Sequence, residues 1–207
     1  MDITTLAQRV LATVPKGRRR LVALAGAPAS GKSTLADHLG KAIPQACVVP
    51  MDGFHLDNRL LDPRGLRARK GSPPSFDAEG FAHLVERLRD ANSVVYPVFD
   101  RSLDKAIAGA GYVAPEIETV ILEGNYLLHD APVWRTLTGF WDLSIYLDVP
   151  EDELRARLVK RWTDHGRSPK EALDKAETND LPNARLVADT LLTPDVQVTF
   201  GELDVAL

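Results

Sequence analysis

Residues Gly26 to Ser33 form the most restrictive motif in this chain. They read Gly-Ala-Pro-Ala-Ser-Gly-Lys-Ser, which is a complete phosphate-binding loop pattern. The apolar run 21–25 directly before the loop predicts a buried strand, and residues 33–39 read as the first turns of a helix. Strand, loop and helix N-terminus in this order predict a polyphosphate site at the carboxyl end of a parallel strand.

The fixed positions of the loop each have a physical reason. Gly26 and Gly31 permit backbone dihedrals and close approaches that a Cβ atom would block. Lys32 can reach the β- and γ-phosphates, and the Ser33 hydroxyl can ligate Mg²⁺. The residues predicted to bind the nucleotide are Gly26, Ala27, Pro28, Ala29, Ser30, Gly31, Lys32, Ser33 and Thr34.

Composition limits the classes of protein to consider. The 207 residues are 44% hydrophobic and 26% charged, so we expect one globular domain over residues 1–207. A formal charge of −4 argues against nucleic acid bound by bulk electrostatics. Cys47 is the only cysteine, which excludes an internal disulfide and favours a cytoplasmic location. No export signal or membrane-spanning stretch is recognisable, so membrane insertion is not expected.

The first half of the chain predicts two strands with helices around them. Within residues 1–18, apolar side chains at helical spacing predict an N-terminal helix, and Arg18 to Arg20 read as a solvated basic turn. A second strand over 46–51 ends at Asp52. Residues 53–76 are rich in Gly, Pro and charge and are too long for a simple connection, so they are expected to bind the acceptor.

Several further elements follow. Asp77 is expected to cap a helix that runs to about Ala91, and residues 94–100 read as an edge strand because Pro97 cannot donate to a ladder. Strands are also predicted over 118–123, 144–149 and 196–200. Strands that alternate with helices predict a parallel α/β sheet.

Two carboxylates end predicted strands and are candidates for chemistry. Asp52 can accept the proton of an attacking alcohol, against the alternative of an ordinary turn aspartate. Glu123 can hold the Mg²⁺ shell, against the alternative of a capping or salt-bridging glutamate. Arg157 and Arg161 share a helix face, and with Arg167 they form an arginine lid within residues 157–170 that neutralises developing charge. Much of this charge could alternatively be a solvated helix face.

Motifs along nearly the whole chain, from about 20 to 195, resemble the uridine kinase, pantothenate kinase and phosphoribulokinase group of P-loop kinases. The nearest likeness is to bacterial proteins named as fructose transport system kinases or nucleoside/nucleotide kinase family proteins. The resemblance rests on the phosphate loop, Met-Asp-Gly-Phe-His at 51–55, Arg-Lys-Gly at 69–71, Ser-Phe-Asp at 75–77, Phe-Asp-Arg at 99–101, Glu-Gly-Asn-Tyr at 123–126 and the arginine-rich stretch 158–167.

This resemblance implies a three-layer fold with a parallel five-stranded sheet of order 2-3-1-4-5, with ATP as donor and Mg²⁺ as cofactor. It implies that Asp52 is the catalytic base, that Glu123 is the acid on the metal side, and that Arg161 and Arg167 are lid cations; Lys32 completes the catalytic set. The residues expected to bind the acceptor are His55, Arg69, Lys70, Phe99, Asp100, Arg101, Asn125 and Tyr126.

The acceptor itself stays open at this point. We expect an ATP-dependent phosphotransferase that acts on an alcohol group of a small polar metabolite, such as a sugar like fructose. The chain has Asp-Gly-Phe-His at 52–55, where uridine kinases usually have an aspartate followed by Ser or Asp and then by Phe-Tyr. It also lacks the additional dimer and coenzyme-A-site segments expected of full-length pantothenate kinases. A nucleoside or pantothenate-like acceptor remains an alternative, as does an ATP-binding regulator without transferase activity. A switch GTPase is disfavoured because no Asn-Lys-x-Asp motif occurs. Whether the protein is a homodimer is not decided by the sequence.

Overall fold

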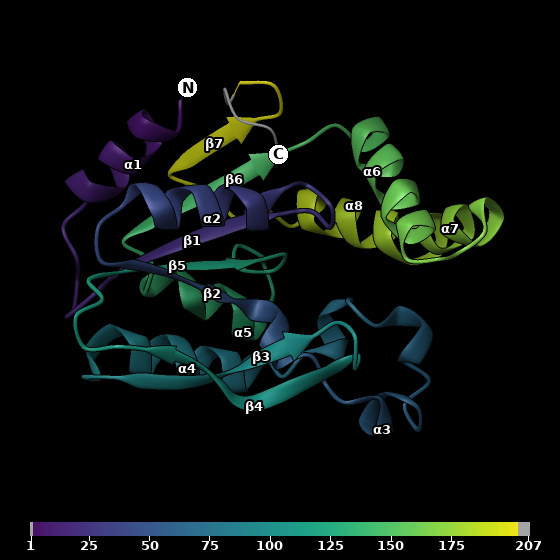
Figure 1. The fold of residues 1–207 in the computed structure, drawn as a ribbon, viewed down its shortest axis with the longest axis horizontal. Helices are drawn as coiled ribbons and strands as arrows, with labels where there is room; N and C mark the ends of the chain where they lie inside the picture. Colours follow the sequence, from purple (N-terminus) through teal and green to yellow (C-terminus); the bar gives the residue numbers. More distant parts are fainter. Residues whose placement is uncertain (1, 203–207) are drawn as a thin grey trace.

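A five-stranded parallel sheet forms the centre of the protein (Figure 1). The computed structural model describes residues 2–202. The strands of this sheet are β1 (Arg20–Gly26), β2 (Ala46–Pro50), β5 (Thr119–Gly124), β6 (Leu143–Asp148) and β7 (Val196–Thr199). Their spatial order is β2-β5-β1-β6-β7. Numbered among themselves along the chain, the five strands have the order 2-3-1-4-5, which confirms the predicted fold class.

Helices cover both faces of this sheet, and β1 shows why. All residues of β1 after its first are buried, so its side chains must pack on both sides. Val22 and Leu24 join a core shared with α1 (Ile3–Ala12) and α2 (Lys32–Ala42). Leu21 and Ala23 join a second core on the other face. The helices of that core are α4 (Ala78–Asp90), capped by Asp77 as predicted, and α5 (Pro132–Thr136). The predicted N-terminal helix is confirmed but ends at Ala12, and Met1 lies outside the described residues.

The prediction that Arg18 to Arg20 form a solvated turn is wrong for Arg19. Arg19 is fully buried at the start of β1. Its guanidinium donates to five backbone carbonyls, namely those of Leu88, Ala91, Asn92, Ala114 and Ile117. The strand ends and the end of α4 leave carbonyls unpaired at this place, and one guanidinium with five N–H donors satisfies them.

Residues 94–100 form a strand, but this strand is not part of the parallel sheet. β3 (Val94–Asp100) pairs antiparallel with β4 (Lys105–Val113) in a separate two-stranded ladder. The ladder register shifts between Tyr96 and Val98, on either side of Pro97, which cannot donate. The sequence did not indicate β4, because its Ala- and Gly-rich stretch has few of the β-branched and aromatic residues that favour strands.

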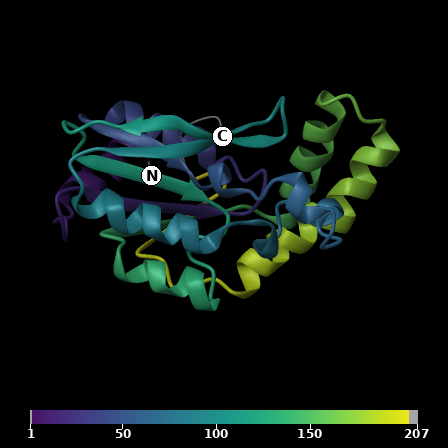
Figure 2. The same ribbon diagram turned by 90° about the horizontal axis from the view of Figure 1, so that it is seen from below.

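Two groups of short elements extend past the carboxyl ends of the parallel strands (Figures 1 and 2). The first follows β2 and contains η1 (Met51–Phe54), α3 (Asn58–Leu61), η2 (Arg67–Arg69) and η3 (Pro73–Ser75). The second follows β6 and contains α6 (Glu151–Asp164), α7 (Pro169–Lys175), the π-helical η5 (Ala176–Asp180) and α8 (Leu181–Asp189). A short 3₁₀ turn, η4 (Leu137–Gly139), follows α5. Among residues 2–202, none of the helices has the length and apolar character needed to cross a bilayer.

Candidate functional site

A cleft of about 750 Å³ lies at the carboxyl edge of the sheet, where the phosphate loop, the 53–76 segment, the β3–β4 turn and the lid helices meet. Ligand sites of open α/β sheets form at this edge. The residues that were predicted from the sequence and that line the cleft are Pro28, Ala29, Gly31, Lys32, Ser33, Thr34, Asp52, His55, Lys70, Phe99, Arg101, Glu123, Asn125, Arg161 and Arg167.

The loop has the backbone shape that its glycines predicted. Gly31 has φ 97° and precedes α2, whose N-terminus has no side-chain cap. A Cβ atom at Gly26 would lie 2.8 Å from the Ser30 hydroxyl oxygen and 3.2 Å from the Leu147 carbonyl oxygen. Ala29 also has a positive φ, at 63°, which is costly for a residue with a side chain. The uncapped N–H groups of α2 therefore face the cleft and can bind an anion.

Lys32 and Glu123 bring opposite charges into the buried end of the cleft. Burial lowers the pKa of Lys32 and raises the pKa of Glu123, while each charge opposes the shift of the other. The nearby Ser33 hydroxyl also favours the charged carboxylate and so opposes the rise in the pKa of Glu123. One hydroxyl and one carboxylate suit Mg²⁺, which takes few protein ligands and completes its shell with phosphate oxygens and water. No cluster of three or more His, Cys, Asp or Glu ligands occurs in the described part of the chain, so an all-protein metal cage is absent there.

Asp52 lies beside this end of the cleft because β2 and β5 are neighbours. Pro50 of β2 pairs in register with Glu123 of β5, and η1 then turns the chain so that Asp52 lines the cleft. Arg101 Nη2 lies 3.1 Å from Asp52 Oδ2 and comes from the residue after β3. The side chain of Asp52 is only 28% exposed, so this ion pair fixes a carboxylate at the centre of the cleft.

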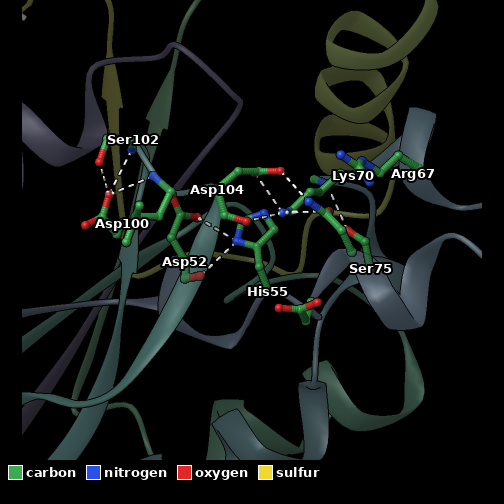
Figure 3. A network of polar contacts seen from close by, with 12 residues as sticks. Asp52, His55, Arg67, Lys70, Ser75, Asp100, Ser102 and Asp104 are labelled. Carbon is green, nitrogen blue, oxygen red and sulfur yellow. Dashed lines mark hydrogen bonds and ion pairs between the residues drawn. The ribbon is translucent and has the colours of Figure 1, made fainter.

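His55 is packed between two aromatic rings. It lies next to Asp52 (Figure 3). The ring centroids of Phe76 and Phe99 lie 4.0 and 4.8 Å from that of His55. Its Nδ1 lies 2.8 Å from the Asp52 carbonyl oxygen. Burial lowers the pKa of His55 against the opposing effect of the Asp52 charge, which favours a neutral imidazole in the folded protein.

The three arginines of the predicted lid have different surroundings. Arg157 donates to the Ser30 carbonyl at 2.9 Å and to Glu153 at 2.7 Å, so it ties α6 to the phosphate loop. Arg161 and Arg167 line the cleft, and neither is within 4.0 Å of a carboxylate of residues 2–202. Arg161 and Arg167 are therefore available to bind a polyanion.

Three residues of the lid region were not predicted, and they form its centre. Trp162 donates from its indole Nε1 to Asp180 Oδ2 at 2.5 Å. Arg161, Arg167 and Lys175 surround the Trp162 ring at 5.7, 5.2 and 5.9 Å from its centroid. Asp180 closes a π-helical turn, a form that often occurs at functional sites. The sequence signal that could have found Asp180 is the group of polar residues at 179, 180 and 183 beside apolar neighbours, and the structure buries all three.

Three of the residues predicted to contact an acceptor do not line the cleft. Tyr126 is fully buried and donates its hydroxyl proton to the Gly71 carbonyl at 2.6 Å, beneath the 53–76 segment. Asp100 accepts from the backbone N–H groups of 102 and 103 and so shapes the β3–β4 turn. Arg69 donates to the Thr178 carbonyl and to Asn183. Each of them supports neighbouring backbone.

Lys70 lines the cleft but is held by its own protein (Figure 3). Its ammonium lies 2.7 Å from Asp104 Oδ1 and 3.0 Å from Asn58 Oδ1. Asp104 was not predicted, because it lies in the turn before the unpredicted strand β4. By contrast, Asn125 keeps an unsatisfied group: its Oδ1 is buried and without a hydrogen-bond partner in the described residues.

Comparisons with known proteins agree with this geometry. The profile described as the phosphoribulokinase/uridine kinase family matches residues 21–188. A Schizosaccharomyces pombe protein named "putative uridine kinase C227.14" is 33% identical, with 92% of this chain and 87% of that protein covered. The Escherichia coli protein named YggC is 36% identical, with 86% and 76% covered. The crystal structure of a "putative fructose transport system kinase" from Silicibacter sp. TM1040 superposes with a TM-score of 0.93 at 52% identity, covering 96% of this chain and 99% of that one.

Proposed function

Because the chain belongs to the phosphoribulokinase/uridine kinase family of P-loop kinases, it is a small-molecule kinase, and we propose that it moves the γ-phosphate of ATP to an alcohol group of a small polar metabolite. The observation that supports this proposal most is the meeting of two carboxylates and one lysine in one cleft. Asp52 follows β2, Glu123 lies near the end of the neighbouring strand β5, and Lys32 lies with them in the cleft. In this arrangement Asp52 can act as the base for the acceptor, while Glu123 is a separate carboxylate on the metal side, near Ser33.

On the donor side, the loop amides and Lys32 would bind the β- and γ-phosphates. Ser33 and Glu123 would hold Mg²⁺, which supplies charge neutralisation on the phosphate oxygens. Arg161 and Arg167 would add positive charge from the lid as the transferred phosphoryl group develops charge. Most of the work of the protein is thus positioning and electrostatic stabilisation.

On the acceptor side, Asp52 would accept the hydrogen bond of the attacking hydroxyl. The hydroxyl oxygen forms a bond to the γ-phosphorus, the bond from that phosphorus to the β–γ bridging oxygen breaks, and ADP leaves. The hydroxyl proton passes to Asp52. Arg101 holds this carboxylate in place from 3.1 Å, and Asn125 offers an unpaired amide oxygen nearby in the cleft.

The names of two relatives suggest candidate acceptors. The Silicibacter protein is named as a kinase of a fructose transport system, which suggests fructose, and the fission yeast protein is named as a uridine kinase, which suggests uridine. A pantothenate-like acceptor is a further candidate from the motif resemblance. We place the reaction in the cytoplasm, where ATP is abundant and the single Cys47 needs no disulfide partner.

Acceptor-dependent ADP release from Mg·ATP tests the proposal, with sugars, nucleosides, glycerate and pantothenate as acceptors. The Asp52→Asn variant should keep ATP binding near normal and lose transfer, because the amide cannot take the proton. The matched control is Asp130→Asn, which changes an exposed carboxylate whose partner Arg135 also lies outside the cleft lining. Wild-type turnover by Asp52→Asn would remove Asp52 from the mechanism. Tight ATP binding with no acceptor-stimulated release would favour a regulatory protein.

A further inference from the structure

Each cation on the acceptor side of the cleft already has a carboxylate partner. The pairs are Lys70 with Asp104 at 2.7 Å, Arg101 with Asp52 at 3.1 Å and Arg67 with Asp62 at 3.0 Å. Three positive and three negative charges thus cancel in this part of the site. An acceptor that enters here finds little net charge to bind.

The Lys70 pair contributes most to this balance, because Lys70 is the least exposed of the three cations, with 13% of its side chain accessible. An ammonium group has three N–H donors. Here the three acceptors are Asn58 Oδ1 at 3.0 Å, Asp104 Oδ1 at 2.7 Å and the Asp104 carbonyl oxygen at 2.9 Å. All the donors of Lys70 are therefore used within the protein, and none is left for an anionic group of a substrate.

Asp104 is itself held in position. It has φ 51°, a left-handed conformation that aspartate tolerates better than most residues. Asn58 Nδ2 donates to its second carboxylate oxygen at 2.7 Å. Asp104, Asn58 and Lys70 thereby tie the β3–β4 turn to the 53–76 segment, so the charge pairing belongs to the wall of the cleft (Figure 3).

The donor side of the same cleft differs. Lys32, Arg161 and Arg167 line it, and none of them is within 4.0 Å of a carboxylate in the part of the chain that the structure describes. A fourth cation, Lys175, comes from the lid and reaches the 53–76 segment, where it donates to the Ala68 carbonyl at 3.1 Å. Burial lowers the pKa of Lys175, and the nearby Asp180 charge opposes this shift. Free positive charge is thus concentrated where a triphosphate would bind.

The groups that remain available beside Asp52 are uncharged. Asn125 has a buried Oδ1 without a partner among the described residues, whereas the Oδ1 of the cleft-lining Asn183 already accepts from Arg69 at 3.4 Å. Burial lowers the pKa of His55 and favours its neutral form, and the His55 ring packs against that of the cleft-lining Phe99. Amides donate and accept hydrogen bonds at once, as hydroxyl groups do.

From this pairing of charges we propose that the acceptor is an uncharged, polyhydroxylated molecule, such as a free sugar, sugar alcohol or the sugar part of a nucleoside. A carboxylate or phosphate ester would have to break a pair in the wall to find a cation, or remain unpaired. This inference rests on the proposed function, since it assumes that the acceptor binds beside Asp52.

Matched acceptor pairs test the inference: fructose with fructose 6-phosphate, ribose with ribose 5-phosphate and glycerol with glycerate. We expect kcat/KM for the neutral member of at least one pair to exceed that of its anionic member by about tenfold or more. Calorimetric binding to the protein saturated with a non-hydrolysable Mg·ATP analogue should show the same preference. An anionic member that reacts or binds as well as its neutral counterpart would overturn the inference.

The Asp104→Asn variant supplies a second test on the same protein. It keeps the size of the side chain and its tolerance of the left-handed backbone, but it leaves Lys70 without its counter-charge. The preference for the neutral member should then fall by about fivefold or more. Asp130→Asn is the matched control, because its partner Arg135 is exposed and neither residue lines the cleft. An unchanged preference in Asp104→Asn would contradict the argument.

The two proposals fail in different ways. Binding of a neutral acceptor without phosphoryl transfer would contradict the proposed function and still support the neutral acceptor class. Transfer to an anionic acceptor alone would support the kinase and overturn the acceptor class. No neutral member binding or reacting in any pair would also overturn the acceptor class.

Discussion

The indole Nε1 of Trp162 donates a hydrogen bond of 2.5 Å to Asp180 Oδ2, and this contact joins the lid helix α6 to the π-helical turn before α8. Asp180 is 8% exposed. The same indole ring lies among the cations Arg161, Arg167 and Lys175. Trp162 therefore positions the cations that face the cleft, although it was not predicted to belong to the site.

Trp162→Phe should weaken both the lid and the fold. The phenyl ring has no N–H, so the buried Asp180 carboxylate loses a donor, and the free energy of unfolding should fall by about 1–3 kcal/mol. Urea denaturation of Trp162→Phe, Asp180→Asn and the double variant measures the coupling. The two losses should be less than additive; strictly additive losses would show that the hydrogen bond contributes nothing.

Arg161→Met should lower kcat by about 100-fold or more, because a cation that stabilises transition-state charge is removed. Arg161 lines the cleft and its guanidinium lies 5.7 Å from the Trp162 ring centroid. Lys160→Met is the control on the same helix, since Lys160 is 75% exposed and pairs only with Asp164 four residues on. Equal kcat values for the two variants in steady-state assays would exclude a role for Arg161 in transfer.

The sequence was enough to place the predicted donor-side residues around one loop, because local order decides their position. A strand, a glycine-rich loop and a helix are contiguous, so Gly26 to Thr34 needed no long-range information. Strand ends placed Asp52 and Glu123 at the same edge for the same reason. The alternation of apolar runs with helices was likewise enough to predict a parallel sheet. Its observed strand order was predicted only through the family resemblance.

The acceptor side could not be predicted in this way. The partner of Lys70 is Asp104, which lies 34 residues away across an Ala- and Gly-rich strand without a clear pattern. Tyr126 was expected in the cleft, yet its place depends on the carbonyl of Gly71, 55 residues away. Contacts between residues far apart in the sequence decide whether a polar residue faces a substrate or supports a loop. The type of a residue and its local sequence do not show which distant residue it will contact.

His55 should make stability depend on pH below neutrality. Burial lowers the pKa of His55 in the folded protein, whereas the unfolded chain titrates near the ordinary value of about 6.5. The unfolded state then binds more protons, so stability is full above about pH 6.5 and falls as the pH drops through the folded pKa. His55→Phe, which keeps an aromatic ring between Phe76 and Phe99, should lose less stability between pH 7.5 and 5.5 than the wild type. His83→Gln, at an exposed histidine, should behave like the wild type, and parallel curves for all three proteins would assign the acid sensitivity elsewhere.

Arg19 and its neighbour Arg18 provide a last, sharp comparison. Arg19 is fully buried and donates to five carbonyls at the end of the sheet opposite the cleft, whereas Arg18 is exposed and donates to one, that of Pro115. Arg19→Met should lower the free energy of unfolding by at least about 3 kcal/mol, because each buried carbonyl left without a donor costs about 1–3 kcal/mol. Arg18→Met should stay within about 0.5 kcal/mol of the wild type. Chemical denaturation of both variants measures this difference, and equal stabilities would mean that water replaces the guanidinium of Arg19 at little cost.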